Sequence, residues 1–408
     1  MYQAVRAQRD RTGARRGSPA GVQPPDRMLR VCLLTDSADP SGVGEHMLAL
    51  AERLGRHCRV SVASRETPGG DAILSRAAAM GCRVLALRWR DEPQAMPELV
   101  RFLRAERIEV FHCHAGIGWE GLPAPFAARE AGVPVVLRTE HLPYLLTDPI
   151  QQARHAEMLP QIDRLICVSQ SSSESFGHAG VPVRLLHVIP NGVAPPRPRR
   201  SREDTRQRLD LDPESPVLLT VGRFTPQKGH AALLAAAPAI LSERPDARFL
   251  WVGAGPLVDD LRGEIDRRGL SDAILLLGRR DDVPDLMAGA DLLVSPSLFE
   301  GHPLVVLEAM AAGLPIVATD VPGTRDAVDR ATALLVPPDD PPGLARAALA
   351  ALGDRRGAET RARAARDHWA ERFDADRMAE DHLALYWATL AAQRPPASAL
   401  PTQAVTQE

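Results

Sequence analysis

The sequence has almost no lysine: of its 49 basic residues only Lys228 is a lysine, and the others are arginines. Aromatic residues make up only 4% of the 408 residues, and the formal net charge is −3 at pH 7. Nucleic-acid binding needs a basic surface, and single-strand binding also uses aromatic side chains on which bases stack. The composition therefore argues against a nucleic-acid partner.

Long hydrophobic runs and paired cysteines are missing as well. No apolar stretch reaches the ~20 residues that a membrane-spanning helix needs, because Glu308 and Pro315 interrupt the longest one. Residues 1–27 have no apolar signal core, so we expect a disordered leader there, with Met28 as the natural start. Five cysteines without a C-x-x-C pair favour free thiols in a reducing compartment. We therefore expect a cytoplasmic protein.

From Met28 onward, short apolar segments alternate with longer amphipathic ones. This alternation is typical of βαβ units, in which helices join buried parallel strands. It stops at residues 190–206, where prolines and arginines crowd, and then resumes, which predicts two doubly wound α/β domains. Buried strands are expected at 29–35, 58–64, 82–88, 108–114, 134–140, 164–169, 216–222, 247–253, 273–278, 291–296, 315–320 and 333–338. The predicted parts are a leader over 1–27, an N-terminal domain over 28–195, a C-terminal domain over 196–370, a helix over 371–393 that packs back on the N-terminal domain, and a disordered tail over 394–408.

The segment VGRFTPQKGH, residues 221–230, predicts an anion site. Arg223 and Lys228 follow a predicted strand and precede a helix that begins near Gly229, and ligands of open α/β sheets bind at this edge. Charge-assisted hydrogen bonds to phosphate contribute ~1.5–3 kcal/mol each, and a helix start adds free N–H groups. A lysine follows a phosphate without the fork geometry of arginine. An ordinary solvated loop is the alternative interpretation.

A second helix start lies in SPSLFEGHPLVVLEAMAAG, residues 295–313. Proline is favoured at the first helical position, so we expect a helix from Pro303 to about Ala312, ended by the glycine that follows. The N–H groups of Leu304 and Val305 are then free to bind an anion at the same edge.

Two glutamates in an E-x7-E arrangement, Glu300 and Glu308, accompany this helix start. Carboxylates repel a bound anion unless they accept hydrogen bonds from hydroxyl groups of the same ligand. A diphosphate with a ribose at one end and a sugar at the other meets both conditions, so the sequence predicts a nucleotide-sugar site. For Glu300 alone, a favourable charge near a helix dipole is the alternative. For Glu308, an unpaired buried carboxylate would be costly.

Together these motifs resemble the GT-B retaining glycosyltransferases of family 4, the glycosyl transferases group 1. The resemblance rests on the E-x7-E segment, VGRFTPQKG, VIPNGV and SGVGEHMLALAERL, and covers roughly residues 28–392. It implies the GT-B fold, with two Rossmann-like domains facing a central cleft. It also implies a metal-independent hexosyltransferase that takes a UDP- or GDP-sugar and retains the anomeric configuration.

The resemblance also implies residue roles. Arg223 and Lys228 bind the donor diphosphate, Glu308 holds the ribose hydroxyls, and Glu300 contacts the donor sugar or its proximal phosphate. His114 resembles a histidine close to the reacting carbon, so the implied catalytic group is His114, Glu300, Arg223 and Lys228. Further donor contacts are implied at Gly42, Gly44, Arg279, Gly301, His302, Pro303, Leu304 and Val305.

The acceptor side is implied to lie on loops of the N-terminal domain, with His141, Trp119 and Tyr144 as candidates. Apolar side chains there allow a saccharide, lipid-linked or small-molecule acceptor, and equally allow simple loop packing. Arginine-rich faces suit a peripheral contact with an anionic inner membrane face. His112 and His114 share one strand face, but a metal site needs further ligands. We therefore expect no metal and no cofactor beside the donor substrate.

The sequence departs from the family pattern at three places: His302 stands where an aromatic is common, Ala194 where Asp is common, and Asp326 where a glutamate is expected. Two other functions suit the same cleft. A nucleotide-sugar epimerase or hydrolase needs no acceptor, and a catalytically silent module would only bind nucleotide sugars. The presence of Lys228 and both glutamates argues against the silent module.

Overall fold

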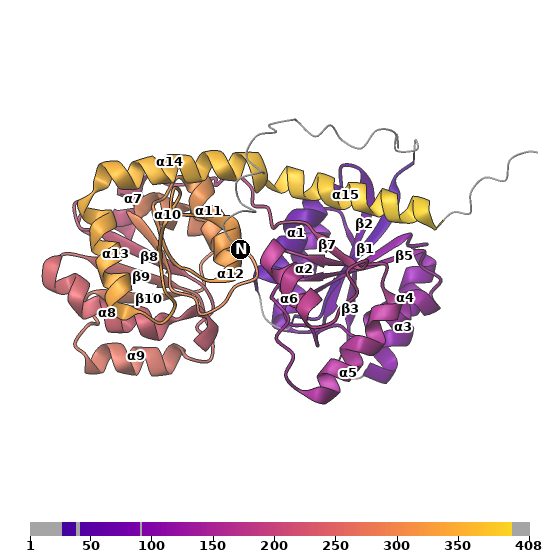
Figure 1. Ribbon diagram of the computed structural model, residues 1–408. Coiled ribbons are helices and arrows are strands. Elements are labelled where there is room, and N and C mark those ends of the chain that lie inside the picture. Colours follow the sequence, from indigo (N-terminus) through magenta and orange to yellow (C-terminus); the bar gives the residue numbers. More distant parts are fainter. Residues whose placement is uncertain (1–26, 38–40, 90–91, 394–408) are drawn as a thin grey trace, which may run out of the picture.

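The computed structural model describes residues 27–37, 41–89 and 92–393. The leader predicted over 1–27, apart from its last residue, and the tail predicted over 394–408 lie outside this range. Two α/β domains lie side by side, with α14 and α15 running across both (Figure 1).

Both sheets are parallel and doubly wound. The first has the strand order β3-β2-β1-β4-β5-β6-β7, and the second has the order β10-β9-β8-β11-β12-β13. Each order reverses beside its first strand, and ligands of such sheets bind at this switch point. The strands are β1 (Leu29–Thr35), β2 (Cys58–Arg65), β3 (Arg83–Leu87), β4 (Val110–Ala115), β5 (Val135–Glu140), β6 (Arg164–Cys167), β7 (Leu186–Val188), β8 (Val217–Val221), β9 (Arg248–Val252), β10 (Ile274–Gly278), β11 (Leu292–Ser295), β12 (Ile316–Thr319) and β13 (Leu334–Val336).

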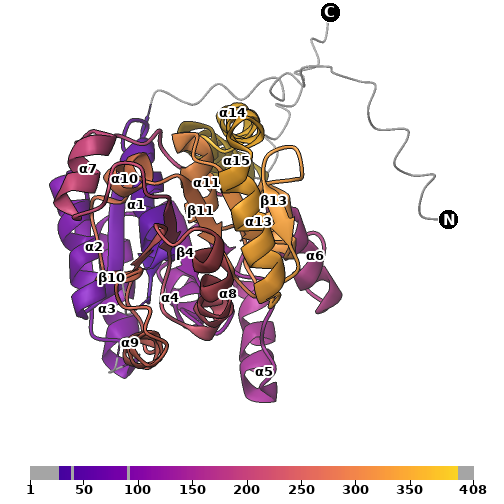
Figure 2. The ribbon, with the colours of Figure 1, turned by 90° about the vertical axis from the view of Figure 1, so that its left-hand side faces the viewer.

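Helices cover both faces of each sheet (Figure 2), and an apolar cluster fills each interface. They are α1 (Gly42–Leu54), α2 (Pro68–Ala79), α3 (Glu92–Ala105), α4 (Ala124–Glu130), α5 (Pro149–Met158), α6 (Gln170–His178), α7 (Arg202–Arg208), α8 (His230–Glu243), α9 (Val258–Arg267), α10 (Val283–Gly289), α11 (Leu304–Ala312), α12 (Pro322–Ala327), α13 (Pro341–Gly353), α14 (Arg355–Arg372) and α15 (Ala375–Ala392), with short 3-10 turns η2 (Leu159–Gln161) and η3 (Pro226–Lys228). The predicted α/β architecture of two parallel-sheet domains is confirmed.

Each of the twelve predicted strand segments contains a strand, but two details differ. β3 was expected to be buried, whereas most of its residues are exposed or half-buried, because it is an edge strand that pairs with β2 alone. β7 was not predicted, because three half-exposed residues carry no run of apolar side chains.

The sequence over 360–393 has the pattern of one continuous helix, but this prediction is wrong, because the chain breaks into α14 and α15 at Phe373 and Asp374. Asp374 is extended, with φ −70° and ψ 141°, and its carboxylate accepts a hydrogen bond from the N–H of Asp376 at the start of α15. Val193 of the interdomain linker donates its N–H to the carbonyl of Phe373 at 2.9 Å. After this break α15 packs against α1 of the first domain.

The linker between the sheets runs from the end of β7 at Val188 to the start of α7 at Arg202. The two chain crossings between the domains therefore touch, since Val193 and Asp374 form a parallel β-bridge. The limits of 195 and 370 for the domains stay a prediction.

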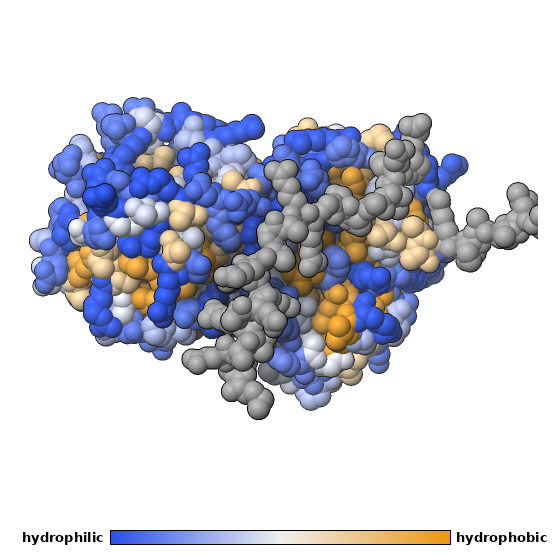
Figure 3. Space-filling model, turned by 45° about the horizontal axis from the view of Figure 1, so that its top comes forward, coloured by the Kyte–Doolittle hydropathy of each residue, from blue (hydrophilic) through white to orange (hydrophobic). Residues whose placement is uncertain are grey.

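The surface in Figure 3 is mostly hydrophilic, with smaller hydrophobic patches on both domains. Within the described ranges, every helix is too short or too polar to cross a bilayer.

Candidate functional site

A pocket of about 240 Å³ lies between the domains, at the carboxyl edges of both sheets. The first domain contributes the start of α1 and the loops after β4 and β5. The second domain contributes the loop after β8 and the start of α11. The predicted site residues that line it are Gly42, His141, Arg223, Lys228, Glu300, His302, Pro303, Leu304, Val305 and Glu308.

A second pocket of about 510 Å³ adjoins the first and shares the start of α1 and Arg223 with it. Arg279, which the resemblance assigns to the nucleobase, lines this second pocket beside the glycines that follow β9. Arg223 is exposed and forms no ion pair within the part of the chain that the structure describes, so its guanidinium is free at the junction of the two pockets.

Lys228 and Glu300 are in direct contact inside the pocket. The distance from Lys228 Nζ to Glu300 Oε1 is 2.6 Å, and the Ser297 hydroxyl donates to the same oxygen at 2.7 Å. The Lys228 side chain is 20% exposed and that of Glu300 only 5%. The ammonium group therefore faces the pocket while its partner lies behind it. The sequence predicted a role for each residue but not this contact.

The loop that carries Lys228 depends on Gly229. This residue has φ 65°, a left-handed conformation that favours glycine. A Cβ atom there would lie 2.0 Å from the carbonyl oxygen of Pro296. The close approach brings η3 against the loop before Glu300, where Leu298 also donates its N–H to the Gln227 carbonyl.

Glu308 points to the pocket from the second turn of α11. Burial raises the pKa of its carboxyl to about 7, and the nearby charge of Glu45 raises it further. Within the described ranges no group donates a hydrogen bond to the Glu308 carboxylate. Glu45 is held by Arg76, whose Nη2 lies 2.9 Å from Glu45 Oε2. Glu308 is thus a half-buried acceptor that lacks donors.

α11 begins at Leu304, one residue later than predicted, and Pro303 is its N-cap with φ −72° and ψ 112°. The first backbone bonds of this turn come from Val306 and Leu307 to the Pro303 carbonyl. The N–H groups of Leu304 and Val305 are left without a backbone acceptor in the described structure. They lie at the pocket, as predicted, where a helix N-terminus favours negative charge.

The loop before α11 is clamped between the domains. A Cβ atom on Gly301 would lie 2.0 Å from the His141 carbonyl oxygen of the first domain. Asn191 donates from Nδ2 to the carbonyl of His302 at 2.8 Å. Burial lowers the pKa of His302 to about 4, so its ring is neutral at pH 7. Its ring packs edge-on against Phe373, with centroids 5.0 Å apart.

His114 does not line the pocket, although the resemblance places it near the reacting carbon. It is 1% exposed and lies behind His141, with His114 Nδ1 3.3 Å from His141 Nε2. Burial lowers the pKa of His141 to about 3, and that of His114 well below its usual range. His112 on the same strand bonds the Tyr386 hydroxyl of α15 at 2.7 Å.

Three other candidates lie away from the pocket. Gly44 is buried inside α1, where a Cβ atom would lie 2.8 Å from Ile73 of α2. Trp119 is 46% exposed on the loop after β4. Tyr144 is half-buried and packs edge-on against the ring of Phe176. Their roles stay predictions.

Several pocket residues were not predicted: Glu45, Asn191 and Gln227. The first two lie inside the motifs SGVGEH and VIPNGV, but neither residue was singled out in those motifs. Asp326, a departure from the family pattern, joins the domains: its Oδ2 accepts hydrogen bonds from the N–H and the hydroxyl of Ser171 in α6.

Two doubly wound parallel sheets with a pocket between their carboxyl edges define a GT-B architecture. The structure of the Anabaena protein HepE in complex with UDP-glucose superposes with a TM-score of 0.76 and 21% identity, over 89% of this chain and all of that one. The family model of Glycosyltransferase Family 4 matches residues 40–197, and the family model of Glycosyl transferases group 1 matches residues 215–354. The chain therefore carries these two glycosyltransferase domains, in this order.

Two relatives of known activity are similar along much of the chain. A UDP-Gal:alpha-D-GlcNAc-diphosphoundecaprenol alpha-1,3-galactosyltransferase of Escherichia coli is 31% identical over 60% of this chain and 65% of its own length. A 2-deoxystreptamine glucosyltransferase of Streptomyces kanamyceticus is 28% identical over 74% of this chain and 82% of its own length. The chain thus matches slightly under two thirds of the first relative.

Proposed function

We propose that the protein transfers a sugar from a nucleotide-sugar donor to an acceptor, with retention of anomeric configuration. One observation carries this proposal. The interdomain pocket combines a lysine, free N–H groups at a helix start and a carboxylate without donors, which are the groups that a diphosphate and its flanking hydroxyls need. The two glycosyltransferase domains and the glycosyltransferase activities of the two relatives agree with it.

In the proposed binding mode, the diphosphate lies between Lys228, Arg223 and the start of α11. Glu308 accepts hydrogen bonds from the ribose hydroxyls, and the nucleobase reaches the second pocket beside Arg279. Lys228 already contacts Glu300, so a bound phosphate shares the ammonium group with that carboxylate. Glu300 then lies where the diphosphate meets the sugar.

The proposed reaction breaks the bond between the anomeric carbon and the diphosphate oxygen. Negative charge develops on the leaving diphosphate, and Lys228, Arg223 and the N–H groups of α11 stabilise it before the sugar has fully formed its new bond. The acceptor hydroxyl attacks the same face of the sugar, and its proton passes to the leaving phosphate. In this proposal the protein cations neutralise the diphosphate without a metal ion.

The acceptor is proposed to bind on the first domain, near His141 and the loop after β4. By their names, one relative acts on a lipid-linked diphosphate sugar and the other on 2-deoxystreptamine. A lipid-linked saccharide or a small polyhydroxylated acceptor is therefore proposed here, the former with peripheral contact to the inner membrane face. The five cysteines are free thiols, four of them buried, and free thiols suit the reducing cytoplasm.

Glu300→Gln tests the proposal. The change preserves size and removes the charge that contacts Lys228, so sugar transfer should fall by roughly 100-fold or more, about 2.7 kcal/mol, while nucleoside diphosphate still binds. Turnover is measured as nucleotide release, and binding as a thermal shift. Unchanged turnover in this variant would show that the Glu300 carboxylate takes no part in sugar transfer.

The anomer of the released sugar tests retention. When water takes the place of the acceptor, the donor is slowly hydrolysed, and proton NMR of the free sugar should first show the anomer of the donor. Initial appearance of the opposite anomer would contradict retention. Release without any acceptor at the full rate would instead favour the hydrolase alternative.

A further inference from the structure

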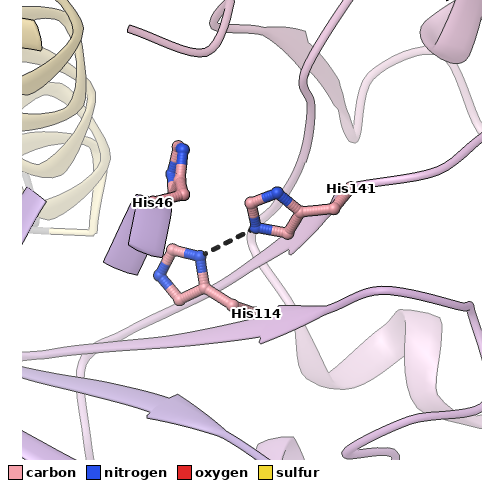
Figure 4. Close-up of side chains that lie close together, drawn as sticks. All are labelled: His46, His114 and His141. Carbon is pink, nitrogen blue, oxygen red and sulfur yellow. Dashed lines mark hydrogen bonds between the residues drawn. The ribbon is translucent and has the colours of Figure 1, made fainter. Parts of the chain in front are cut away.

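Three histidine side chains from separate elements converge beside the pocket (Figure 4). His46 comes from the first turns of α1, His114 from the carboxyl end of β4, and His141 directly follows β5. All three are at least nine-tenths buried. From the sequence, only His112 and His114 could be placed together, and a metal site needed further ligands. In the structure, His46 and His141 supply such ligands beside His114.

The spacing of the ring nitrogens suits a tetrahedral metal ion. Two nitrogens bound ~2.05 Å from one zinc ion at the tetrahedral angle lie about 3.3 Å apart. His114 Nδ1 and His141 Nε2 are 3.3 Å apart. One ring nitrogen from each histidine lies within 4.8 Å of the other two. The third ring must close in by at most about 1.5 Å, and rotation about χ2 of a histidine is broad.

Several nitrogens of this cluster lack partners. Within the described ranges, both ring nitrogens of His46, and Nε2 of His114, are buried without a hydrogen bond of ordinary geometry, and the Asn191 side chain lies beside the His46 ring. A buried polar atom without a partner is destabilising, because it has given up its hydrogen bonds to water. Imidazole nitrogens bind zinc, nickel, copper and cobalt well, whereas calcium and magnesium prefer oxygen. A transition-metal ion would take a lone pair of the His46 ring and would replace the hydrogen bond between His114 Nδ1 and His141 Nε2 with two metal–nitrogen bonds.

We propose that His46, His114 and His141 form a binding site for one divalent transition-metal ion, with Zn²⁺ as the physiological class. The ion enters through the pocket, because His141 lines it. A water molecule or an anion completes its coordination. Since the ion fixes His141 and takes the lone pair of His114, its binding inhibits transfer. The inhibition rests on the proposed function, whereas the metal-binding site does not.

Cobalt binding tests the site directly. Titrated with Co²⁺ alone, the metal-free protein should show the visible absorbance of a tetrahedral complex and saturate at one equivalent. His46→Gln should remove that absorbance, because it deletes a ligand that is outside the proposed catalytic group. His57→Gln is the matched control, since His57 is an exposed histidine at the end of α1. Absorbance that His46→Gln leaves intact would overturn the site.

A measurement on the unchanged chain guards against misfolding of the variant. X-ray absorption at the zinc edge of the Zn²⁺-loaded protein should show three imidazole ligands at about 2.0 Å. Oxygen-only coordination, or loss of the ion on passage through metal-free buffer, would contradict the proposal.

The inhibition is tested separately from binding. One equivalent of Zn²⁺ should reduce nucleotide release at least tenfold in the wild type, but not in His46→Gln, and a chelator should restore it. Equal rates with and without bound zinc would overturn the inhibition and leave the site. If the metal-free protein releases no nucleotide at all, the proposed function fails, while the cobalt result still decides the site.

Discussion

At the residue scale, the geometry around Lys228 explains why a lysine stands there in a chain that otherwise uses arginine. Its stem runs along Gly222, where a Cβ atom would lie 3.4 Å from Lys228 Cδ. The ammonium group then ends 2.6 Å from Glu300 Oε1 and faces the pocket. A guanidinium is larger and planar, and it prefers to hold a carboxylate with two parallel bonds. It would hold Glu300 and leave less of its charge for a ligand.

Lys228→Ala should weaken binding of a nucleoside diphosphate by roughly 10- to 100-fold, because one charge-assisted bond is lost and Glu300 remains unpaired. Lys228→Arg should recover less than half of the lost binding free energy. Arg267→Ala, on the exposed face of α9, is the control. Isothermal calorimetry with UDP and GDP measures all three. Full binding by Lys228→Ala would show that the ammonium group does not contact the phosphates.

The raised pKa of Glu308 makes the free energy of unfolding depend on pH. Its pKa is raised from 4.5 to about 7 in the folded protein, so the folded state holds a proton that the unfolded state has lost between these values. The free energy of unfolding should therefore fall as the pH rises through this window, and Glu308→Gln should remove that slope.

The same proton affects the ligand. An ionised Glu308 accepts hydrogen bonds from two ribose hydroxyls, so nucleotide affinity should rise as the pH passes through about 7. In Glu308→Gln the affinity should be lower and flat in this range. Chemical denaturation and calorimetry from about pH 5 to about pH 8 measure both effects. If Glu308→Gln kept the wild-type pH profiles of stability and nucleotide affinity, another group would be responsible for the titration.

At the scale of elements, the loop before α11 controls the width of the pocket. Its Gly301 touches the first domain so closely that any side chain would meet the His141 carbonyl. The start of α11, with its free N–H groups, is held in place by the same contact. The Asn191 bond to the His302 carbonyl acts at the next residue.

Gly301→Ala should therefore push the domains apart and reduce nucleotide release roughly tenfold or more, about 1.4 kcal/mol. Gly263→Ala is the matched control: this glycine lies in α9, and nothing lies within 4 Å of the added atom. X-ray scattering should show a larger radius of gyration for Gly301→Ala only. Equal activity and size in both variants would mean that this contact does not set the pocket.

The elements also show what sequence could and could not predict. The central strands were predicted because strands buried on both faces form continuous apolar runs, and the E-x7-E helix because Pro303 and Gly313 mark its ends. The break at Asp374 was missed, since it depends on a bridge to Val193 that is distant in sequence. His46 was missed because helical periodicity shows that a face is buried, but not which strand lies behind it.

At the scale of the whole molecule, the pocket exists only where the two domains meet. Three contacts hold them beside it: the Asn191 amide on the His302 carbonyl, the Asp326 carboxylate on Ser171, and the paired chain crossings at Val193. The helix α15 returns to the first domain and places Tyr386 on His112. The phosphate-binding groups of the second domain and the histidines of the first are thereby brought together.

Nucleotide release from a panel of UDP-, GDP-, ADP- and TDP-sugars tests whether the pocket binds and turns over a nucleotide sugar. It compares the wild type with Lys228→Ala, in metal-free buffer. We expect the wild type to release nucleotide slowly from one donor. We expect Lys228→Ala to release none, because the phosphates of that donor bind Lys228. The absence of both nucleotide release and a thermal shift, with every donor and nucleotide in the panel, would contradict the proposed function and leave a pocket built for another ligand.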